Sequence, residues 1–400
     1  MKFNRACTYA VTTTFILASV PAAYAWGAAG HQIVATIAQI YLHPTTLSNV
    51  CEILYPGSST SRQSPPCNLA TIASWADQIK RQPKYRYTAP LHYIGALGDH
   101  PSEACAFPGP RGWAGKKDAN VLGAVRNVTN ILVEYTNGLY DAEAAADALK
   151  FLVHYLGDMH MPLHLTGRDR GGNGDRVTFD GRVTNLHSLW DSLLIAQRLR
   201  TIPTNYTRLF PPGTTSIDVE SHLRGAIYDP YVRRVMFEGM GVGSVSGRYE
   251  KDYLNWLSCP AVETQSVWNT LQTVFGLHQL GDESRWDDDM LCPFAWAKQL
   301  HPLNCDLVWP PELDEPPYKN TGEVARSSVE ETAVTSRPNP HPDLLELDTP
   351  EYAGRIRDEW VVERLMAMAG VRLAGLLNGL FMNPEAFKEG LINGLRKKAM

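Results

Sequence analysis

The sequence of 400 residues lacks several features that would place it in a common class. Beyond its N-terminal region it has no run of about 18 apolar residues, so no transmembrane helix is expected. It has no C-x-x-C pair, which argues against metal binding by thiolates, and no internal repeat. The glycine-rich stretch 239–247 lacks the Lys-Ser/Thr ending of a phosphate-binding loop.

Basic charge is also scarce. The chain has 37 Lys and Arg against 42 Asp and Glu, which gives a formal net charge of −5. Because binding along nucleic-acid phosphates draws on Lys and Arg, this composition argues against an extended footprint on duplex DNA. With 44% hydrophobic and 10% aromatic residues, the chain has enough apolar surface for a globular core.

The first 25 residues have the pattern of a secretory signal peptide. Two basic residues lie within the first five, an apolar stretch covers 10–20, and 23–25 read Ala-Tyr-Ala. Cleavage after Ala25 makes Trp26 the first residue of a secreted protein. The alternative is a membrane anchor, but the apolar stretch is short and contains threonines.

The cysteine count agrees with export. Cys7 lies in the predicted signal peptide, and six cysteines remain: Cys51, Cys67, Cys105, Cys259, Cys292 and Cys305. An even number in an exported chain favours three disulfides, with buried free thiols as the alternative. Asn127 and Asn205 begin N-x-T triplets and are candidate glycosylation sites.

Apolar residues at helical spacing dominate the rest of the chain. They predict helices over 30–41, 69–80, 120–135, 141–161, 184–199 and 350–380. Strand signals are sparse, and the best is a short hairpin over 176–183. The expected fold is therefore mainly α.

Histidine and aspartate recur at one particular spacing. His154 and Asp158 are four residues apart in one predicted helix, and His187 and Asp191 are four apart in the next. This spacing puts both side chains of a pair on one helix face, where they can reach the same ion. Further candidates in or before this region are His31, Asp77, His92 and His164.

Neutral imidazole and carboxylate are ligands that suit zinc. A single H-x-x-x-D pair is more often a surface pair than a ligand set, so the pattern depends on its repetition. His160 lies six residues from His154, roughly on the opposite side of the helix, and is expected to be structural. The histidines at 43, 100, 222, 278, 301 and 341 have no such partner spacing.

With these residues in place, the chain resembles the zinc-dependent, single-strand-specific nucleases (the S-one/P-one nuclease family), which share a helical fold with bacterial zinc phospholipases C. The resemblance covers residue 26 to about residue 210 and returns at 369–374. Its pieces are Trp26-Gly27 with Gly30-His31, Trp75-Ala76-Asp77, Leu91-His92-Tyr93, His154-Tyr155-Leu156-Gly157-Asp158, Pro162-Leu163-His164, Gly171-Gly172-Asn173 and Asn185-Leu186-His187-Ser188-Leu189-Trp190-Asp191.

The resemblance implies three zinc ions per chain. The first would be held by Asp77, His92, His154 and Asp158. The second would be held by His164, His187 and Asp191. The third would be held by His31, by Asp158 as a bridging ligand, and by the free α-amine and carbonyl of Trp26. Because an amide nitrogen is a poor ligand, the third site implies that the signal peptide must be removed.

The resemblance also implies roles beside the metals. Asp77 would orient the attacking water, Lys80 and Asn173 would contact phosphate, and Tyr93 would stack on a base. Each of the last three has a plainer interpretation. Lys80 can be a solvated surface residue, Asn173 a turn residue and Tyr93 part of the core.

One disulfide, Cys105–Cys305, is implied by the resemblance. The other four cysteines are then expected to pair locally, Cys51 with Cys67 and Cys259 with Cys292, on proximity along the chain alone.

The implied function is a secreted endonuclease that cuts single-stranded RNA and DNA to 5′-phosphorylated products and also acts on 3′-nucleotides. The alternatives are a zinc phospholipase C and a binding protein that kept the fold without the activity. Tyr93 and the segment Trp75-Ala76-Asp77-x-x-Lys80 favour the nuclease, and the complete set of candidate ligands argues against loss of activity.

The expected organisation is one helical domain over 26–400 that acts as a monomer. The chain departs from the family over 232–292, at the Pro-rich, acidic stretch 309–347 and at the basic end near Lys397. These are expected to be insertions and a tail, with 309–347 solvated because it has few apolar residues.

Overall fold

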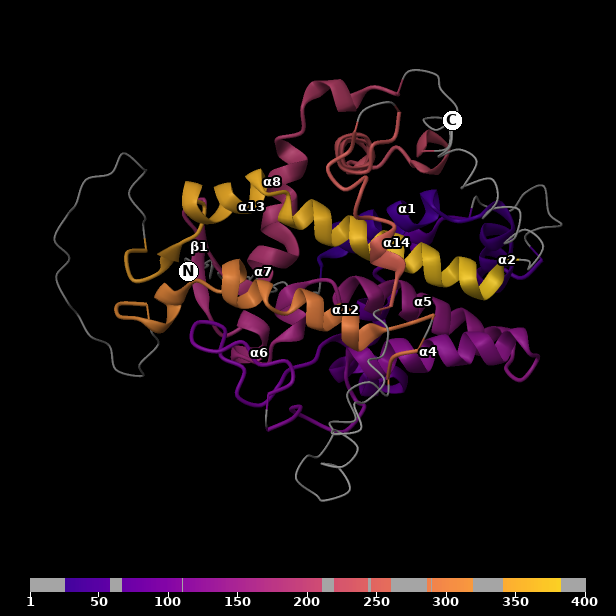
Figure 1. Cartoon of the computed structure of the whole chain (residues 1–400), viewed down its shortest axis with the longest axis horizontal. Coiled ribbons are helices and arrows are strands. Elements are labelled where there is room, and N and C mark those ends of the chain that lie inside the picture. Colours follow the sequence, from indigo (N-terminus) through magenta and orange to yellow (C-terminus); the bar gives the residue numbers. More distant parts are fainter. Residues whose placement is uncertain are drawn as a thin grey trace, which may run out of the picture.

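The computed structural model describes residues 26–57, 67–109, 111–210, 219–243, 246–259, 286–288, 290–318 and 341–382. Over these residues the fold is mainly helical with one small sheet, which confirms the predicted class (Figure 1). The predicted signal peptide, the centre of each expected insertion, His278 and the tail near Lys397 lie outside the described residues.

The described chain consists of α-helices and of shorter 3-10 and π-helical segments. The α-helices are α1 (Ala28–Ile40), α2 (Pro44–Leu54), α3 (Trp75–Ile79), α4 (Val121–Thr136), α5 (Ala142–Asp158), α6 (Asp169–Gly172), α7 (Leu186–Ser188), α8 (Leu194–Arg200), α10 (Asp229–Arg234), α12 (Pro293–Leu300), α13 (Arg355–Asp358) and α14 (Val361–Phe381). The short 3-10 and π-helical segments are η2 (Leu69–Thr71), η3 (Pro83–His92), η4 (Pro162–Leu165), η5 (Leu189–Leu193), η6 (Thr204–Thr207), η7 (Val235–Gly239), η8 (Asn255–Leu257), η10 (Asn304–Val308), η11 (Pro311–Asp314) and η12 (Pro350–Gly354).

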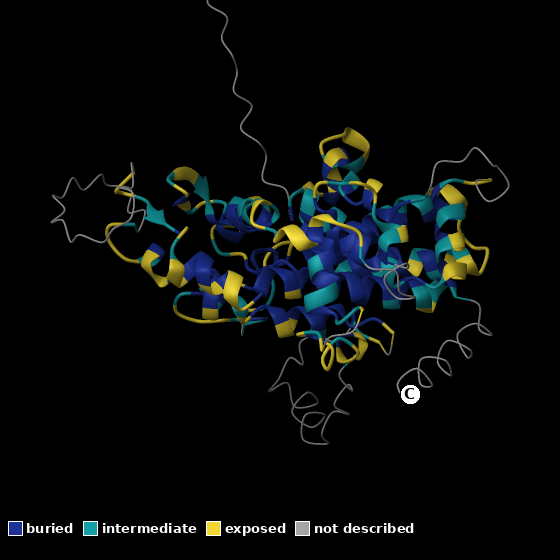
Figure 2. Cartoon of the chain, turned by 90° about the horizontal axis from the view of Figure 1, so that it is seen from above, coloured by how far each residue is buried: buried dark blue, intermediate teal, exposed yellow. Residues whose placement is uncertain are grey.

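The core is built around α14, which crosses the middle of the molecule in Figure 1 and packs against α1, α2 and α5. Figure 2 shows the buried segments gathered at the centre and the exposed ones at the periphery. Gly370 permits the close approach of α14 to α1, because a Cβ there would lie 2.8 Å from the Ile37 Cβ and 3.0 Å from the Val34 carbonyl oxygen. None of the described helices has the length and apolar character needed to cross a membrane.

Helix α5 shows why a sequence pattern can fix an element. The Asp141 side chain caps its N-terminus by accepting a hydrogen bond from the Ala144 backbone N–H at 2.8 Å. The helix ends at Asp158, three residues before the predicted end at 161, and Pro162 prevents it from continuing. Its last turn therefore carries the His154 and Asp158 pair at a fixed place in the core.

The sheet adds a long-range contact to the predicted hairpin. Strands β1 (Arg176–Phe179) and β2 (Arg182–Asn185) pair antiparallel, with Val177 opposite Thr184. Strand β3 (Leu345–Glu346) pairs parallel with β1, so the sheet order is β2-β1-β3. The hairpin prediction is confirmed, and the second strand runs two residues further than expected.

Three predicted helices are interrupted. The segment 69–80 is divided into η2 and α3, and the Ala73 carbonyl between them accepts a hydrogen bond from His154 Nδ1 at 2.8 Å. The segment 184–199 begins as strand β2 and continues as α7, η5 and α8. In both cases tertiary contacts outweigh the local helical pattern.

The third interruption lies in 350–380, which forms η12, α13 and α14 rather than one helix. Trp360 separates α13 from α14 with a left-handed φ of 57°. The guanidinium groups of Arg234 and Arg248 lie 4.6 and 4.9 Å from its ring centroid, and its carbonyl accepts a hydrogen bond from the Tyr249 hydroxyl. These contacts come from distant segments that a local pattern cannot reveal.

The two expected insertions are anchored in the core at their described ends. Trp256 and Trp286 in the first are buried, and the Trp286 carbonyl accepts a hydrogen bond from Arg126 Nε at 2.8 Å. In the second, Trp309 and Leu313 are buried, and β3 lies near its end. The expectation that 309–347 is solvated is therefore wrong for its two ends, because large apolar side chains there pack into the core.

All three expected disulfides are present. Cys51 pairs with Cys67, Cys105 with Cys305 and Cys259 with Cys292. The second bond joins the loop after η3 to η10 across 200 residues of sequence. Asn127 and Asn205 both have exposed side chains, as glycosylation at these positions would require.

Candidate metal centre

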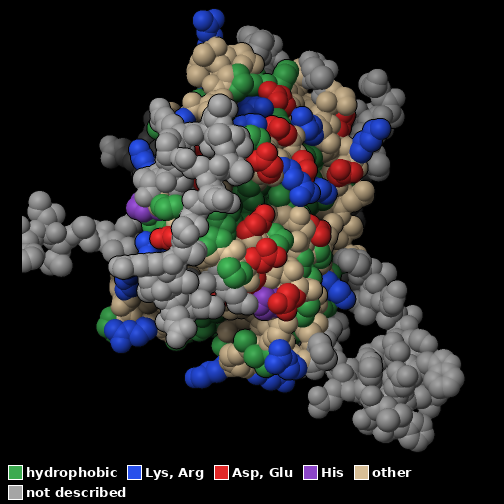
Figure 3. Space-filling view, turned by 90° about the vertical axis from the view of Figure 1, so that its left-hand side faces the viewer, with side chains coloured by type: hydrophobic (Ala, Val, Ile, Leu, Met, Phe, Trp, Pro, Cys, Tyr) green, Lys and Arg blue, Asp and Glu red, His purple; other side chains and the backbone are tan. Residues whose placement is uncertain are grey.

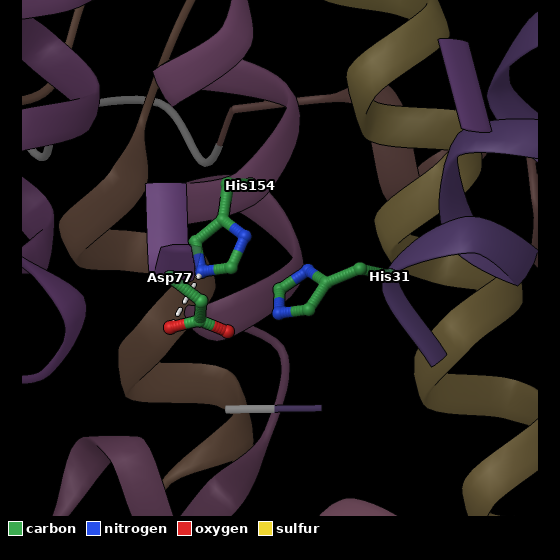
Figure 4. Close-up of side chains that lie close together, drawn as sticks. All are labelled: His31, Asp77 and His154. Carbon is green, nitrogen blue, oxygen red and sulfur yellow. Dashed lines mark ion pairs between the residues drawn. The ribbon is translucent and has the colours of Figure 1, made fainter. Parts of the chain in front are cut away.

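Four helical segments bring a first group of side chains together in the core. His154 and Asp158 lie on α5, His31 on α1 and Asp77 on α3, and all four are almost completely buried. His92, at the end of η3, completes the group and is only 3% exposed. Figure 4 shows how His31, Asp77 and His154 point toward one another from their separate elements.

The Asp158 carboxylate is shared by three imidazoles. Its Oδ1 lies 3.2 Å from His31 Nε2, while its Oδ2 lies 2.9 Å from His92 Nδ1 and 3.3 Å from His154 Nε2. The His31 and His154 rings stack with their centroids 3.8 Å apart. One carboxylate at the centre of three rings is an arrangement that can bridge two neighbouring ions.

Asp77 connects this group to the rim of the site. Its Oδ1 is 3.6 Å from His154 Nε2 and 3.7 Å from His92 Nδ1. The same oxygen is 2.7 Å from the ammonium nitrogen of Lys80, whose side chain is 21% exposed. The salt bridge therefore reaches from the buried cluster toward solvent.

A second cluster adjoins the first. His164 comes from η4, His187 from α7 and Asp191 from η5. His187 Nε2 lies 3.2 Å from Asp191 Oδ2, and the two histidine rings stack at 5.0 Å. His164 Nδ1 is 4.0 Å from Asp158 Oδ1, so the two clusters are neighbours.

Backbone carbonyls orient three of the imidazoles. His154 Nδ1 donates to Ala73, His164 Nδ1 to His92 and His187 Nδ1 to Gly171, at 2.8, 2.6 and 2.7 Å. A proton held on Nδ1 leaves Nε2 as the lone-pair nitrogen, which is the form that binds a metal ion. Sequence reasoning missed these carbonyls, because no residue type marks a backbone acceptor.

The Gly171 carbonyl sits on an unusual piece of backbone. Asp169, Arg170, Gly171 and Gly172 all have positive φ, so α6 is a left-handed turn. A Cβ at Gly171 would lie 2.4 Å from the Leu163 carbonyl oxygen, which leaves no room for a side chain. The paired glycines of the sequence were the one available signal for this turn.

The protonation states also fit a cation. Burial works to raise the pKa of Asp158, but His154 and the hydrogen bonds to His31 and His92 hold that pKa well below its usual range. Burial lowers the pKa of His164 to about 3 and raises the pKa of Asp191 to about 6. Burial works to lower the pKa of His187, but Asp191, its neighbour at 3.2 Å, raises that pKa, so a positive charge is stabilised beside this buried carboxylate, and a divalent cation could supply it.

Buried polar atoms without a hydrogen-bond partner also favour a bound cation. His164 Nε2 and Asp191 Oδ1 are buried without a hydrogen-bond partner among the described residues. Buried polar atoms are nearly always paired, so such atoms within a cluster of metal-type ligands fit the binding of a metal ion. His164, His187 and Asp191 form one group that could hold a metal, and His92, His154 and Asp158 form another, as do His31, Asp77 and His154.

Three other predicted site residues are Trp26, Tyr93 and Asn173. Their contacts in the structure do not by themselves assign them a role. Trp26 is completely buried at the start of α1, and the next residue, Gly27, donates a backbone hydrogen bond to the Asp191 carbonyl at 2.7 Å. Tyr93 follows His92 and is 52% exposed, so it is not a core residue. Asn173 Nδ2 donates to the Arg170 carbonyl at 2.8 Å, which is a turn contact.

His160 and His301 are buried histidines that belong to neither of the two clusters described above. His160 is buried away from the clusters, where Nδ1 donates to the Leu156 carbonyl and Nε2 lies 2.9 Å from Arg372 Nη1, which confirms its structural role. His301 lies 2.8 Å from Asp99 beside Cys105. Because Cys105 is in a disulfide, its sulfur is not available as a thiolate ligand there.

A substitution at Gly157 tests how tightly the first cluster is packed. In Gly157→Ala the new Cβ would lie 2.8 Å from His31 Nδ1, and His31 cannot retreat because it stacks on His154. We expect a loss of about 1–3 kcal/mol in the free energy of unfolding and a lower zinc content per chain. Urea unfolding and elemental analysis measure the two effects.

Gly379→Ala is the matched control, since Gly379 is also helical and its new Cβ would meet only the flexible Met290 side chain at 3.4 Å. Equal stability and equal zinc content in the two variants would contradict the close packing of His31.

Comparison with known proteins agrees with this geometry. Residues 26–221 match the S1/P1 nuclease family. Nuclease S1 of Aspergillus oryzae is 40% identical over 178 residues, which cover 44% of this chain and 56% of that protein. Nuclease P1 of Penicillium citrinum is 40% identical over 170 residues, covering 42% of this chain and 58% of that protein.

A plant relative, endonuclease 2 of Arabidopsis thaliana, is 33% identical over 191 residues, which cover 46% of this chain and 61% of that protein. The chain thus spans less than two thirds of the length of each of these relatives. The matched region contains both clusters and every candidate ligand. Residues 26–221, just under half of the chain, are therefore similar to the S1/P1 nuclease family.

Proposed function

We propose that this chain is a secreted, zinc-dependent endonuclease. It hydrolyses phosphodiester bonds in single-stranded RNA and DNA, leaves 5′-phosphorylated products, and also acts on 3′-nucleotides. The observation that carries the proposal is the pair of adjoining, buried His/Asp clusters within the region that matches the nuclease family.

The residues present fit three zinc ions. Asp77, His92, His154 and Asp158 would hold one, and His164, His187 and Asp191 a second. Trp26, His31 and Asp158 would hold the third, with the α-amine of Trp26 as a ligand. When bound, zinc supplies a Lewis acid that stabilises negative charge on phosphate oxygens and makes water a better nucleophile at neutral pH.

The chain's own residues have the following roles in the proposal. Asp77 accepts a hydrogen bond from the attacking water and so orients it, while Lys80 holds Asp77 and offers its ammonium group to a phosphate oxygen. Asn173 donates to the phosphate from the turn that it closes. Tyr93 stacks on the base next to the scissile bond, which requires an unstacked nucleotide and so favours single strands.

Secretion and a monomeric state complete the proposal. Three disulfides suit an oxidising compartment, and the N-terminal pattern of residues 1–25 supplies the export signal. All candidate ligands come from one chain, so no second copy is needed to complete a cluster.

The test is an assay of the processed protein on single-stranded DNA, RNA and phosphatidylcholine, with and without a chelator. We expect nucleotide release that stops when the chelator is added and returns with zinc. Hydrolysis of phosphatidylcholine alone would assign the chain to the phospholipase alternative. Binding of DNA or RNA without chelator-sensitive cleavage would leave only a binding protein.

A further inference from the structure

Basic and aromatic residues are concentrated in one segment of an otherwise acidic chain. Residues 80–93 read KRQPKYRYTAPLHY, with four Lys or Arg, three Tyr and no Asp or Glu. The whole chain has a net charge of −5, and on the face seen in Figure 3 acidic and basic side chains are interspersed. The segment connects two candidate ligands, Asp77 and His92, and most of it forms η3.

The 3-10 geometry of η3 sorts these side chains onto faces. In a 3-10 helix residues three apart lie above one another. Tyr85 and Thr88 face the protein. The Tyr85 ring packs on Trp75 at 5.5 Å, its hydroxyl donates to Asp147, and Thr88 is 1% exposed. The neighbouring face, with Lys84 and Tyr87, is turned to solvent.

Tyr87 is the most informative residue on this outer face. It is 68% exposed, and its ring makes no aromatic contact or hydrogen bond in the part of the chain that the structure describes. Arg86 beside it is also exposed. A large aromatic residue exposed on a 3-10 helix, near Lys84 and Arg86 in the chain, forms a surface suited to a ligand rather than to the core.

The outer face leads away from the metal clusters. Tyr87 is five residues before His92, and a rise of about 2.0 Å per residue places it about 10 Å from that ligand along the helix. The second exposed tyrosine, Tyr93, is next to His92.

We infer that η3 is a binding strip for a single strand that extends beyond the scissile nucleotide. In this strip Tyr87 stacks on a second base, and Arg86 and Lys84 bind backbone phosphates. The inference rests on the proposed function and names a part of its substrate site. Proteins that bind single strands combine a cationic groove with stacking aromatic side chains in this way, without reading sequence.

The chemistry favours a nucleic acid over other partners. Four cations and no acid within 14 residues complement a chain of phosphates, and the exposed tyrosines supply flat faces for bases. Lys84 lies 3.7 Å from Glu143, but both side chains are largely exposed, so this pair is weak and gives way to a phosphate.

Substrate length is the variable that tests the strip. The measurement is the ratio of kcat/KM on a thymidine 12-mer to kcat/KM on a thymidine dinucleotide, because only the 12-mer reaches Tyr87. For Tyr87→Ala we expect this ratio to fall about tenfold. For Arg86→Gln we expect the slope of log affinity for the 12-mer against log salt to become shallower by about 0.7.

Tyr140→Ala and Arg208→Gln are the controls, since both residues are exposed and lie outside the segment. Neither variant should change the ratio or the salt slope. If the ratio in Tyr87→Ala equals that of the parent, the strip is refuted, even if kcat/KM falls equally on both substrates.

Direct binding separates this inference from the proposed function. Fluorescence anisotropy with the intact protein and a labelled, cleavage-resistant phosphorothioate 12-mer needs no cleavage. If the parent binds the 12-mer, and Tyr87→Ala weakens that binding while Tyr140→Ala does not, the strip stands even for a protein that fails the nuclease assay. Equal binding by all three proteins would refute the strip even if the nuclease activity is confirmed.

Discussion

Asp158→Asn is expected to lower kcat/KM on single-stranded DNA by more than about 100-fold. Loss of a residue that only supports a metal ligand costs about 10–100-fold, and Asp158 is proposed to be a ligand itself. The reason is the position of its carboxylate, which lies within 3.3 Å of imidazole nitrogens from His31, His92 and His154. An amide removes the negative charge that would bridge two ions. Zinc per chain should fall together with activity.

The control for this change is Asp358→Asn, because Asp358 is an exposed carboxylate at the end of α13. Its activity and zinc content should match those of the parent. If Asp158→Asn keeps full zinc occupancy and activity within tenfold of the parent, the shared-carboxylate role assigned to Asp158 is wrong.

A chain that retains Ala25 before Trp26 is expected to bind one zinc ion fewer and to lose at least about tenfold in activity. A free α-amine has a pKa of about 8 and can bind zinc when deprotonated, whereas an amide nitrogen is a poor ligand. Trp26 is also completely buried, and a Cβ added at Gly30 would lie 2.9 Å from the Trp26 Cβ, so its surroundings are tightly packed.

An engineered protease site directly before Trp26 gives the matched comparison in one protein. Zinc content and activity are measured before and after cleavage, and both should rise when the amine is released. Equal values before and after cleavage would contradict the third zinc site while leaving the other two clusters untouched.

The parts of the fold that the sequence predicted are those with strong local determinants. Helix α5 has a capping Asp141, a run of helix formers and a Pro162 that ends it. Helices α1 and α4 likewise agree with prediction to within two residues at each end. The break at Trp360 was not predictable, because it depends on Arg234, Arg248 and Tyr249 from elsewhere in the chain.

In the candidate site, too, the parts set by local spacing were predictable and the parts set by distant segments were not. The spacing of His154 and Asp158, and of His187 and Asp191, survives into the structure because four residues make about one helical turn, even though the second pair spans α7 and η5. Residues such as His31 and Asp77 could be grouped with them only through the family resemblance. The strip on η3 depends on a 3-10 helix, and no pattern of residue types predicted its threefold period.

The candidate ligands are spread along the chain from Trp26 to Asp191, and Gly27 near one end of this range bonds to the Asp191 carbonyl at the other. On the proposed function, an unfolded or partly synthesised chain is therefore a latent enzyme. Its first cluster needs α1, α3, η3 and α5 assembled, and its N-terminal ligand needs the export step. On the same proposal, the chain has its full set of ligands only after export has freed the α-amine of Trp26, so its activity inside the producing cell is lower than its activity outside.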